Sequence, residues 1–317
     1  MQVCRLVLTL LLCWSSSNSF AQCPANPVTP NPEMIQRLMD QASDHGFLWK
    51  VSKNGWVSWL YGTIHANRLD GVMPGLKTRA ALQQSDALAV ELDISDNATL
   101  SEIARLGRQG AGKIPRRFQS RLNAQLEALC LPASLTQQLH PILLFGSMMV
   151  MAGKPDGIET DFGTDLLLIS AAKTAQKPVI ALETAAEQIN TLIGGDRSVS
   201  EAEIESALSQ IESGSARKQL SKMVDAWIDS DLSVMENYRD WCECEKSAED
   251  RRVMKRLLDD RNLIMAQRID ELLRKDQSLF VAVGSLHMIG KGGLPSLLRA
   301  KAYQVELVLG EPLSSHH

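Results

Sequence analysis

The sequence predicts an α/β fold: a single domain in which two β-α-β halves form a mixed sheet around a large helical insertion. Residues 59–65 and 280–287 are two copies of one plan, an apolar run that ends in Gly-x-x-His. Each copy continues through a turn marked by glycine or proline into a helix-like run, and then into an apolar run that contains Val-Glu-Leu. A continuous apolar segment, residues 178–182, is typical of a buried strand in a parallel sheet. Strands that alternate with helices in this way favour the α/β class.

The first half begins with a predicted β-hairpin. Residues 48–52 and 57–61 alternate between apolar and polar side chains on either side of a Lys-Asn-Gly turn, which favours a tight hairpin. The second arm leads directly to His65. Residues 76–84 are then predicted to be a helix, and residues 87–94 a strand that contains Glu91.

The centre of the chain is predicted to be mostly helical. Residues 162–174 read as a helix, and the strand that ends at Leu182 is followed by Glu183 and a capping box over residues 184–187. In the second half we expect a strand over 279–283, a helix over 294–301 and a strand over 304–309. The fold is therefore predicted to occupy residues 47–313, with a helical insertion at about 99–153 and 199–275.

The first 21 residues have the pattern of a secretory signal peptide. Arg5 precedes an apolar run over residues 6–12, and Ser19 and Ala21 form a small-residue exit, so we expect cleavage after Ala21. The apolar run is shorter than the ~20 residues that a membrane span needs. Residues 22–46 are read as a linker and a short helix. The mature chain is thus predicted to be exported, to the periplasm or the medium, without a stable membrane span.

Charge and cysteine content narrow the partners and the compartment. A net charge of −4 provides no basic surface for nucleic acid. Cys23, Cys130, Cys242 and Cys244 are an even set, which predicts disulfide bonds in an oxidising compartment and leaves three full pairings open. The spacing of Cys242 and Cys244 is poor for a zinc knuckle.

Four side chains that could do chemistry follow predicted strands. They are His65, Glu91, Glu183 and His287. Ligands of open α/β sheets bind outside the carboxyl ends of the strands, so we expect these side chains to meet. Two imidazoles and two carboxylates are a suitable set of ligands for zinc, manganese or cobalt, and we predict that His65, His287 and Glu91 bind such an ion.

Each of these residues also has a structural interpretation. A histidine after a strand is often only hydrogen-bonded, although the repeated motif favours a site for His65 and His287. Glu91 could be a solvated strand end, and Glu183 could simply stabilise the helix that follows it. Glu306, the counterpart of Glu91 in the second copy, is read as structural, as are His45, His140, His316 and His317.

Helical periodicity adds Arg261 and Asn262 to the candidates. In the predicted helix over residues 248–274, Arg261 falls on the apolar stripe, which also includes Met265 and Ile264, and Asn262 lies beside it. A buried guanidinium without an anionic partner is costly. Arg261 is therefore predicted to meet a carboxylate or an anionic group of a substrate.

These motifs, in this order, resemble the TraB/GumN family, which includes the animal TIKI proteins. The resemblance covers about residues 47–309, and the stretches that carry it are residues 48–51, 60–65, 85–93, 182–184, 260–262 and 281–287. It implies that both histidines, a strand-end glutamate and the Arg-Asn pair face a common cleft. TIKI members are described as metal-dependent proteases, most bacterial members have no assigned reaction, and TraB is tied to shutting down a peptide pheromone.

The function predicted from these observations is an exported, divalent-metal-dependent hydrolase, a peptidase that acts on peptides or proteins. His65 and His287 would hold the ion, and Glu91 or Glu183 would serve as a ligand or general base. Arg261 would stabilise an oxyanion or hold a substrate carboxylate. The alternative is a catalytically silent protein of the same fold that sequesters a peptide, since the sequence contains no His-Glu-x-x-His.

Overall fold

The computed structural model describes residues 31–195, 198–275 and 277–310. The chain divides into two compact units. Apart from the gaps just named, the helical unit contains residues 94–159 and 184–221, and the sheet unit contains residues 31–93, 160–183 and 222–310. The predicted signal peptide, Cys23 and the chain after residue 310 lie outside the described residues.

The sheet unit contains a six-stranded mixed sheet. Its strands are β1 (Phe47–Lys53), β2 (Trp56–Thr63), β3 (Ala87–Val90), β4 (Val179–Ala181), β5 (Leu279–Gly284) and β6 (Gln304–Leu309). Their order is β4-β3-β5-β2-β1-β6. The pairs β4/β3, β3/β5 and β5/β2 are parallel, whereas β1 is antiparallel to both of its neighbours. The predicted α/β class with a mixed sheet is therefore confirmed.

The two predicted β-α-β halves interleave. The first is β2, α3 (Leu76–Gln84) and β3, and the second is β5, α15 (Leu294–Ala300) and β6. Strand β5 of the second half lies between β2 and β3 of the first, and Thr63 pairs with Gly284. Parallel neighbours end at the same edge of a sheet, so both Gly-x-x-His segments leave the sheet side by side.

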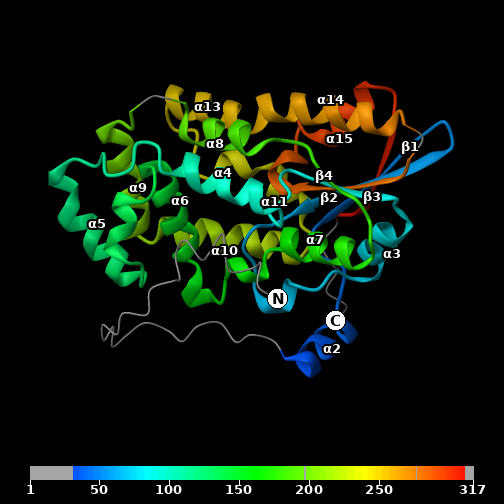
Figure 1. Ribbon diagram of the computed structural model, residues 1–317, viewed down its shortest axis with the longest axis horizontal. Helices are drawn as coiled ribbons and strands as arrows, with labels where there is room; N and C mark the ends of the chain where they lie inside the picture. Colours follow the sequence, from blue (N-terminus) through cyan, green and yellow to red (C-terminus); the bar gives the residue numbers. More distant parts are fainter. Residues whose placement is uncertain (1–30, 196–197, 276, 311–317) are drawn as a thin grey trace. The chain divides into compact units, whose positions relative to one another are not determined.

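Helices cover both faces of this sheet. Figure 1 shows α14 and α15 above the strands, and α3 and α7 below them. Besides α3 and α15, the α-helices of the sheet unit are α2 (Pro32–Asp40), α7 (Thr164–Thr174), α11 (Leu232–Glu236), α12 (Tyr238–Trp241), α13 (Ala248–Met254) and α14 (Arg261–Leu273). Helix α10 (Ser215–Ile228) crosses the boundary between the units. The buried core includes Phe47, Leu48, Leu60, Leu88, Phe280 and Val281, each at most 1% exposed.

The helical unit has a separate core. Its helices are α4 (Asn97–Gly107), α5 (Arg116–Ala128), α6 (Pro141–Met151), α8 (Ala185–Ile193) and α9 (Glu201–Glu212). The capping box predicted at Thr184 and Glu187 is present at the start of α8. Leu122, Leu144 and Leu208 are among the fully buried side chains of an apolar cluster in this unit. Among the described residues, no helix is both long enough and apolar enough to span a membrane.

Three local predictions were wrong in extent. The strand predicted over 178–182 is only the three-residue β4, and Ala181 is exposed because β4 forms an edge of the sheet. The strand predicted over 87–94 ends at Val90. The helix predicted over 248–274 is interrupted by a π-helix over Lys255–Asp260, and Ile264 is 48% exposed. A π-helical turn holds more residues than an α-turn, so the buried stripe of α14 is shifted and Ile264 falls outside it.

The remaining predictions concern side chains outside the site. Cys242 and Cys244 form a disulfide bond. His45 and His140 are buried, with Nδ1 of His45 bonded to a backbone carbonyl and Nδ1 of His140 accepting the Ile142 N–H at the start of α6. Glu306 is exposed on β6, in agreement with its structural interpretation.

Replacing Gly62 by alanine tests the close packing between the two motif copies. A Cβ there would lie 2.8 Å from Ser285 Oγ and 3.2 Å from Ser285 Cα, so we expect Gly62→Ala to destabilise the protein by about 1–3 kcal/mol. Gly146→Ala in α6 is the control, because a Cβ at that position would meet no described atom within 4 Å apart from the backbone of its own helix, and alanine favours a helix. Denaturant unfolding measures both. Equal stability of Gly62→Ala and the wild type would contradict the packing described here.

Candidate functional site

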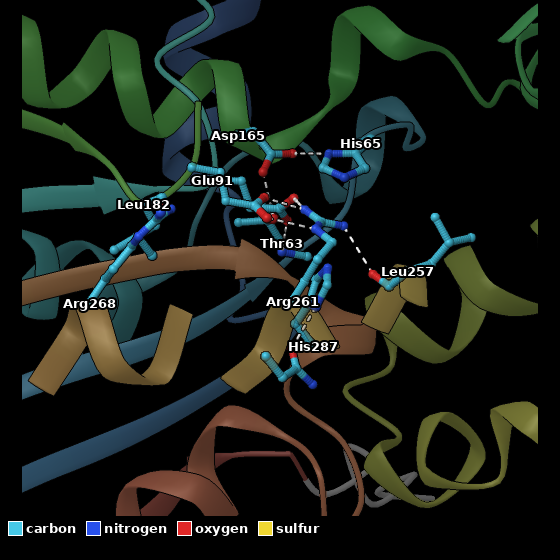
Figure 2. Close-up of polar contacts among 12 residues, drawn as sticks. Thr63, His65, Glu91, Asp165, Leu182, Leu257, Arg261, Arg268 and His287 are labelled. Carbon is cyan, nitrogen blue, oxygen red and sulfur yellow. Dashed lines mark hydrogen bonds and ion pairs between the residues drawn. The ribbon is translucent and has the colours of Figure 1, made fainter. Parts of the chain in front are cut away.

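The two Gly-x-x-His segments are joined by a hydrogen bond between equivalent parts of the repeat. Ser285 Oγ, one residue after the second motif glycine, donates to the backbone oxygen of Thr63, one residue after the first, over 2.9 Å. The first glycine also lies where the other copy leaves no space for a side chain, since a Cβ on Gly62 would collide with Ser285. All residues of this site belong to the sheet unit, and Figure 2 shows their polar contacts.

Gly284 marks the point on which three predicted residues converge. A Cβ at this position would lie 3.2 Å from Glu91 Oε1, 3.6 Å from His65 Nε2 and 3.8 Å from His287 Cδ2. The backbone N–H of Gly284 donates to Glu91 Oε1 over 2.8 Å. The structure thus brings together both histidines and the strand-end glutamate that the sequence proposed as metal ligands, and glycine leaves the space between them open.

An acidic partner holds the imidazole of His65. Its Nδ1 lies 2.9 Å from Asp165 Oδ2, and the hydroxyl of Thr63 donates to Asp165 Oδ1 over 2.6 Å. The negative charge of Asp165, together with its hydrogen bond to the ring, raises the pKa of His65 to about 9. The His65 side chain is nevertheless 71% exposed, so Nε2 is accessible from solvent.

Helix α7 brings Asp165 to this position. The Thr164 N–H donates to Ile64 O over 3.0 Å, and the Ile64 N–H donates to Thr164 Oγ1 over 3.1 Å. These two bonds attach the start of α7 to the end of β2. A Cβ on Gly163 would lie 2.6 Å from His65 O, so only glycine permits this approach.

The second histidine occupies a different environment. His287 is 4% exposed, and its Nδ1 lies 2.6 Å from Asn262 Oδ1. The amide orientation of Asn262 is fixed because its Nδ2 donates to Gly292 O over 2.8 Å. His287 Nδ1 therefore carries the proton, and Nε2 has a free lone pair. Burial lowers the pKa of His287 to about 4 despite the nearby Glu91, so the ring is neutral at pH 7.

Arg261 links the two predicted glutamates. Its Nε donates to Glu183 Oε1 over 2.8 Å, and its Nη2 donates to Glu183 Oε2 and to Glu91 Oε2, each over 2.5 Å. Its Nη1 donates to Leu257 O over 3.2 Å. Arg261 is 8% exposed. The sequence predicted that this buried guanidinium meets a carboxylate or a substrate anion, and its partners are the carboxylates of Glu91 and Glu183.

These contacts fix the protonation of the glutamate at the centre. Burial opposes the ionisation of Glu91, but the imidazoles of His287 and His65, the guanidinium of Arg261 and the Gly284 N–H outweigh it and lower the pKa of Glu91 to about 2. Burial likewise opposes the charge of Arg261, and its glutamate partners raise its pKa above the usual range. The carboxylate and the guanidinium are both charged at neutral pH.

A π-helical turn sets the start of the helix that carries Arg261 and Asn262. Residues Lys255–Asp260 form the π-helix, and α14 begins at Arg261. Turns of this kind occur frequently at functional sites. Further along α14, Arg268 Nη1 donates to Leu182 O, which fixes the backbone next to Glu183 (Figure 2).

The imidazoles of His65 and His287 and the carboxylate of Glu91 are groups that bind divalent ions, but they are not close enough together to coordinate one as they stand. In residues 31–195, 198–275 and 277–310, no group of three or more His, Cys, Asp or Glu side chains is close enough to hold a metal ion. Each histidine nevertheless has its Nδ1 on an oxygen acceptor, the arrangement typical of metal-binding histidines, with Nε2 left as the donor. Glu91 is the carboxylate nearest to the space at Gly284, and Arg261 contacts both Glu91 and Glu183.

Sequence reasoning missed Asp165 and Thr63. Asp165 stands in the first turn of a helix that was predicted correctly, directly after the Gly163-Thr164 pair, and this start of a helix beside a strand end was the available signal. Thr63 and Ser285 both follow a motif glycine, so a hydroxyl recurs at the same place in each copy. That recurrence was visible in the sequence.

Replacing Asp165 should lower the pKa of His65. We expect Asp165→Asn to bring it from about 9 toward the ordinary value of 6.5, measured by NMR titration of the metal-free protein. In the wild type the pair stabilises the fold fully below about pH 6.5, and this contribution disappears as the pH rises through about 9. Thr63→Val, which keeps the carboxylate, should leave the pKa of His65 raised. An unchanged pKa in Asp165→Asn would contradict the assignment.

Arg261→Met should reveal the cost of two buried carboxylates without their cation. We expect a loss of about 3–5 kcal/mol of unfolding free energy at pH 7. The pKa of Glu91 is lowered in the wild type, so the stability that it contributes is present above about pH 4.5 and is lost as the pH falls toward 2. The difference between wild type and variant should therefore shrink on acidification.

Arg274→Met is the matched control for this experiment. Arg274 lies at the end of the same helix with a side chain that is 70% exposed, and it pairs with Asp270. The Arg274 side chain is exposed, and the buried Asp270 keeps its bond from Tyr303 and its ion pair with Lys301 when Arg274 is replaced, so the variant should lose less than about 1 kcal/mol. If denaturant unfolding showed equal losses in the two variants, the buried contacts of Arg261 would contribute no more to stability than those of the exposed Arg274.

Comparisons with known proteins place the chain among its relatives. The chain is 26% identical to a zebrafish (Danio rerio) protein named Metalloprotease TIKI1, over 96% of this chain and 71% of the relative. It is 27% identical to the uncharacterized protein YbaP of Escherichia coli K12 and to that of Shigella flexneri, over 76% of this chain and 87% and 88% of those proteins. No solved structure matches it. The model of the TraB/PrgY/gumN family matches residues 47–307, which span both motifs and the Arg-Asn pair, and the chain belongs to this family.

Proposed function

We propose that this protein is a divalent-metal-dependent hydrolase that cleaves peptides at the site of the sheet unit. The observation that carries the proposal is the convergence of His65, His287 and Glu91 on the open space at Gly284. Family membership supports it, as does the similarity to a relative that is named a metalloprotease.

The charge of the cluster also favours a cation. Glu91, Glu183 and Asp165 bring three carboxylates to the cluster, and Arg261 bonds to Glu91 and Glu183. The negative charge of these carboxylates would attract a divalent ion such as manganese, cobalt or zinc.

The two histidines would bind such an ion from different protonation states. His287 is neutral at pH 7 and offers Nε2 without losing a proton, while Asn262 holds the ring in place. His65 is charged in the absence of an ion and must release the Nε2 proton, and Asp165 keeps Nδ1 protonated. With Glu91 they would hold an ion that polarises a carbonyl group and lowers the pKa of a water molecule.

Arg261 has a different role from the one expected from the sequence. Four of its five N–H groups bond to Glu183, Glu91 and Leu257 O, so it cannot bind a substrate carboxylate in a bidentate manner. It orients the two glutamates, and one N–H on Nη1 is left for a substrate oxygen. Both carboxylate oxygens of Glu183 accept from Arg261, whereas Glu91 contacts Arg261 through Oε2 and lies at the space beside Gly284, so Glu91 is better suited to act as a ligand or base.

We infer that the reaction takes place outside the cytoplasm. The inference rests on the predicted signal peptide over residues 1–21 and on the disulfide between Cys242 and Cys244, since such bonds persist in oxidising compartments. The similarity to a relative that is named a metalloprotease supports a peptide or protein as the substrate.

The repeat offers a matched pair of variants to test the proposal. Glu91 and Glu306 both stand in Val-Glu-Leu, but Glu306 is exposed on β6. We expect Glu91→Gln to reduce kcat/KM for peptide cleavage by at least about 100-fold, in line with the loss of a catalytic group, and Glu306→Gln to leave it unchanged. Peptide turnover with added manganese, cobalt or zinc is measured by mass spectrometry, with circular dichroism as the check on folding.

Metal binding distinguishes the proposal from the sequestering alternative. His65→Ala removes an exposed side chain and little buried surface, so it should fold normally while its bound metal falls at least about tenfold by elemental analysis. A strong chelator should stop turnover by the wild type. If peptides bind without cleavage, and neither the chelator nor His65→Ala alters that binding, the protein is a peptide-binding member of the family and the hydrolase proposal is wrong.

A further inference from the structure

The disulfide between Cys242 and Cys244 encloses a single residue. It lies between α12, which ends at Trp241, and α13, which begins at Ala248. Cys242 is 2% exposed, whereas Cys244 is partly exposed. The bridge is in the sheet unit and takes no part in the site described above.

This bridge is poorly suited to stabilise the fold. A disulfide stabilises a protein mainly by restricting the unfolded chain, and the effect grows with the length of the loop that it closes. Cys242 and Cys244 are only two positions apart, so nearly the shortest loop is closed. A structural role gives little reason for its presence.

The residue enclosed by the bridge adopts an unfavourable backbone conformation. Glu243 has φ +55°, in the left-handed region that non-glycine residues seldom occupy. The short ring holds Glu243 there as long as the two sulfurs are bonded. Reduction would allow this residue to relax, which favours the dithiol over the disulfide, and strained bridges of this kind are the labile ones.

The surrounding contacts keep the two cysteines together after reduction. Arg239, before the bridge, forms a salt bridge with Glu245, after it, over 2.8 Å. Arg251 Nη1 also donates to Glu245 O over 3.2 Å. Because these contacts close the segment independently of the sulfurs, the thiols stay near each other and the bond can form again.

We propose that Cys242 and Cys244 form a thiol–disulfide exchange site that accepts electrons from a dithiol. A thiolate of the dithiol attacks Cys244 Sγ, the more exposed sulfur, and the Cys242–Cys244 bond breaks with Cys242 leaving as a thiolate that takes up a proton. The second thiolate of the dithiol then attacks its partner sulfur in the mixed disulfide and releases Cys244 as a thiolate, which also takes up a proton. Two electrons and two protons reach the cysteines, and the dithiol becomes a disulfide.

Variants of Glu243 test this proposal through the backbone strain. The folded protein is equilibrated with mixtures of reduced and oxidised dithiothreitol, quenched with acid and alkylated, and the peptide that contains both cysteines is weighed. Asn tolerates the left-handed conformation better than Glu, and the β-branched Val tolerates it worse. We expect Glu243→Asn to require at least about a threefold higher ratio of reduced to oxidised reagent, and Glu243→Val a lower ratio.

The wild-type pair should also be reduced and reoxidised reversibly while circular dichroism shows an unchanged fold. A bridge that stays oxidised until the protein unfolds would overturn the proposal. So would equal reduction midpoints in Glu243→Asn and Glu243→Val. The readout is the thiol content alone, so neither result depends on hydrolase activity.

Discussion

The parallel pairing of β2 with β5 is the constraint on which the site depends. It joins strands from opposite ends of the sequence and places Thr63 opposite Gly284, so both histidines emerge at one edge of the sheet. Strand β3 pairs with β5 on its other side and brings Glu91 to the same place. A shift in the pairing of β2 with β5 would separate these groups, since strand register decides which side chains meet. The interleaving of the two halves thus produces one site rather than two.

The pairing of like motifs produces an asymmetric site because their surroundings differ. His65 is exposed and held by a carboxylate, whereas His287 is buried and held by an amide. Their pKa values therefore move in opposite directions, one to about 9 and the other to about 4. An environment that separates the pKa values of two equivalent groups gives them different chemical tasks.

The buried guanidinium between two glutamates has a cost that packing alone would avoid. Replacing a buried ion pair by apolar side chains is often neutral or stabilising. Arg261 nevertheless holds Glu91 and Glu183 in fixed orientations, and Glu91 also accepts the Gly284 N–H beside the histidines. The arrangement is understandable if the carboxylate must be charged and in place for function. The π-helix before Arg261 is a second local departure from regular structure that serves the same position.

The sequence predicted what depends on local pattern and on the repeat. The helix at Leu76–Gln84 and the strand at Gln304–Leu309 were predicted to the residue, as was the capping box at Thr184. The burial of Arg261 followed from periodicity. The position of Asp165 depends on hydrogen bonds between α7 and the end of β2, which are far apart in the sequence and leave no periodic trace. The π-turn was also invisible in the sequence, because an apolar stripe does not show where one residue is added.

The most direct test of the account is a crystal structure of the protein with added zinc, using anomalous diffraction at the zinc edge. The account places the anomalous peak within about 2.0–2.1 Å of Nε2 of both His65 and His287, next to the carboxylate of Glu91. Zinc bound elsewhere, or imidazoles that keep only their Asp165 and Asn262 contacts at full zinc saturation, would contradict the claim that the paired motifs form a metal site.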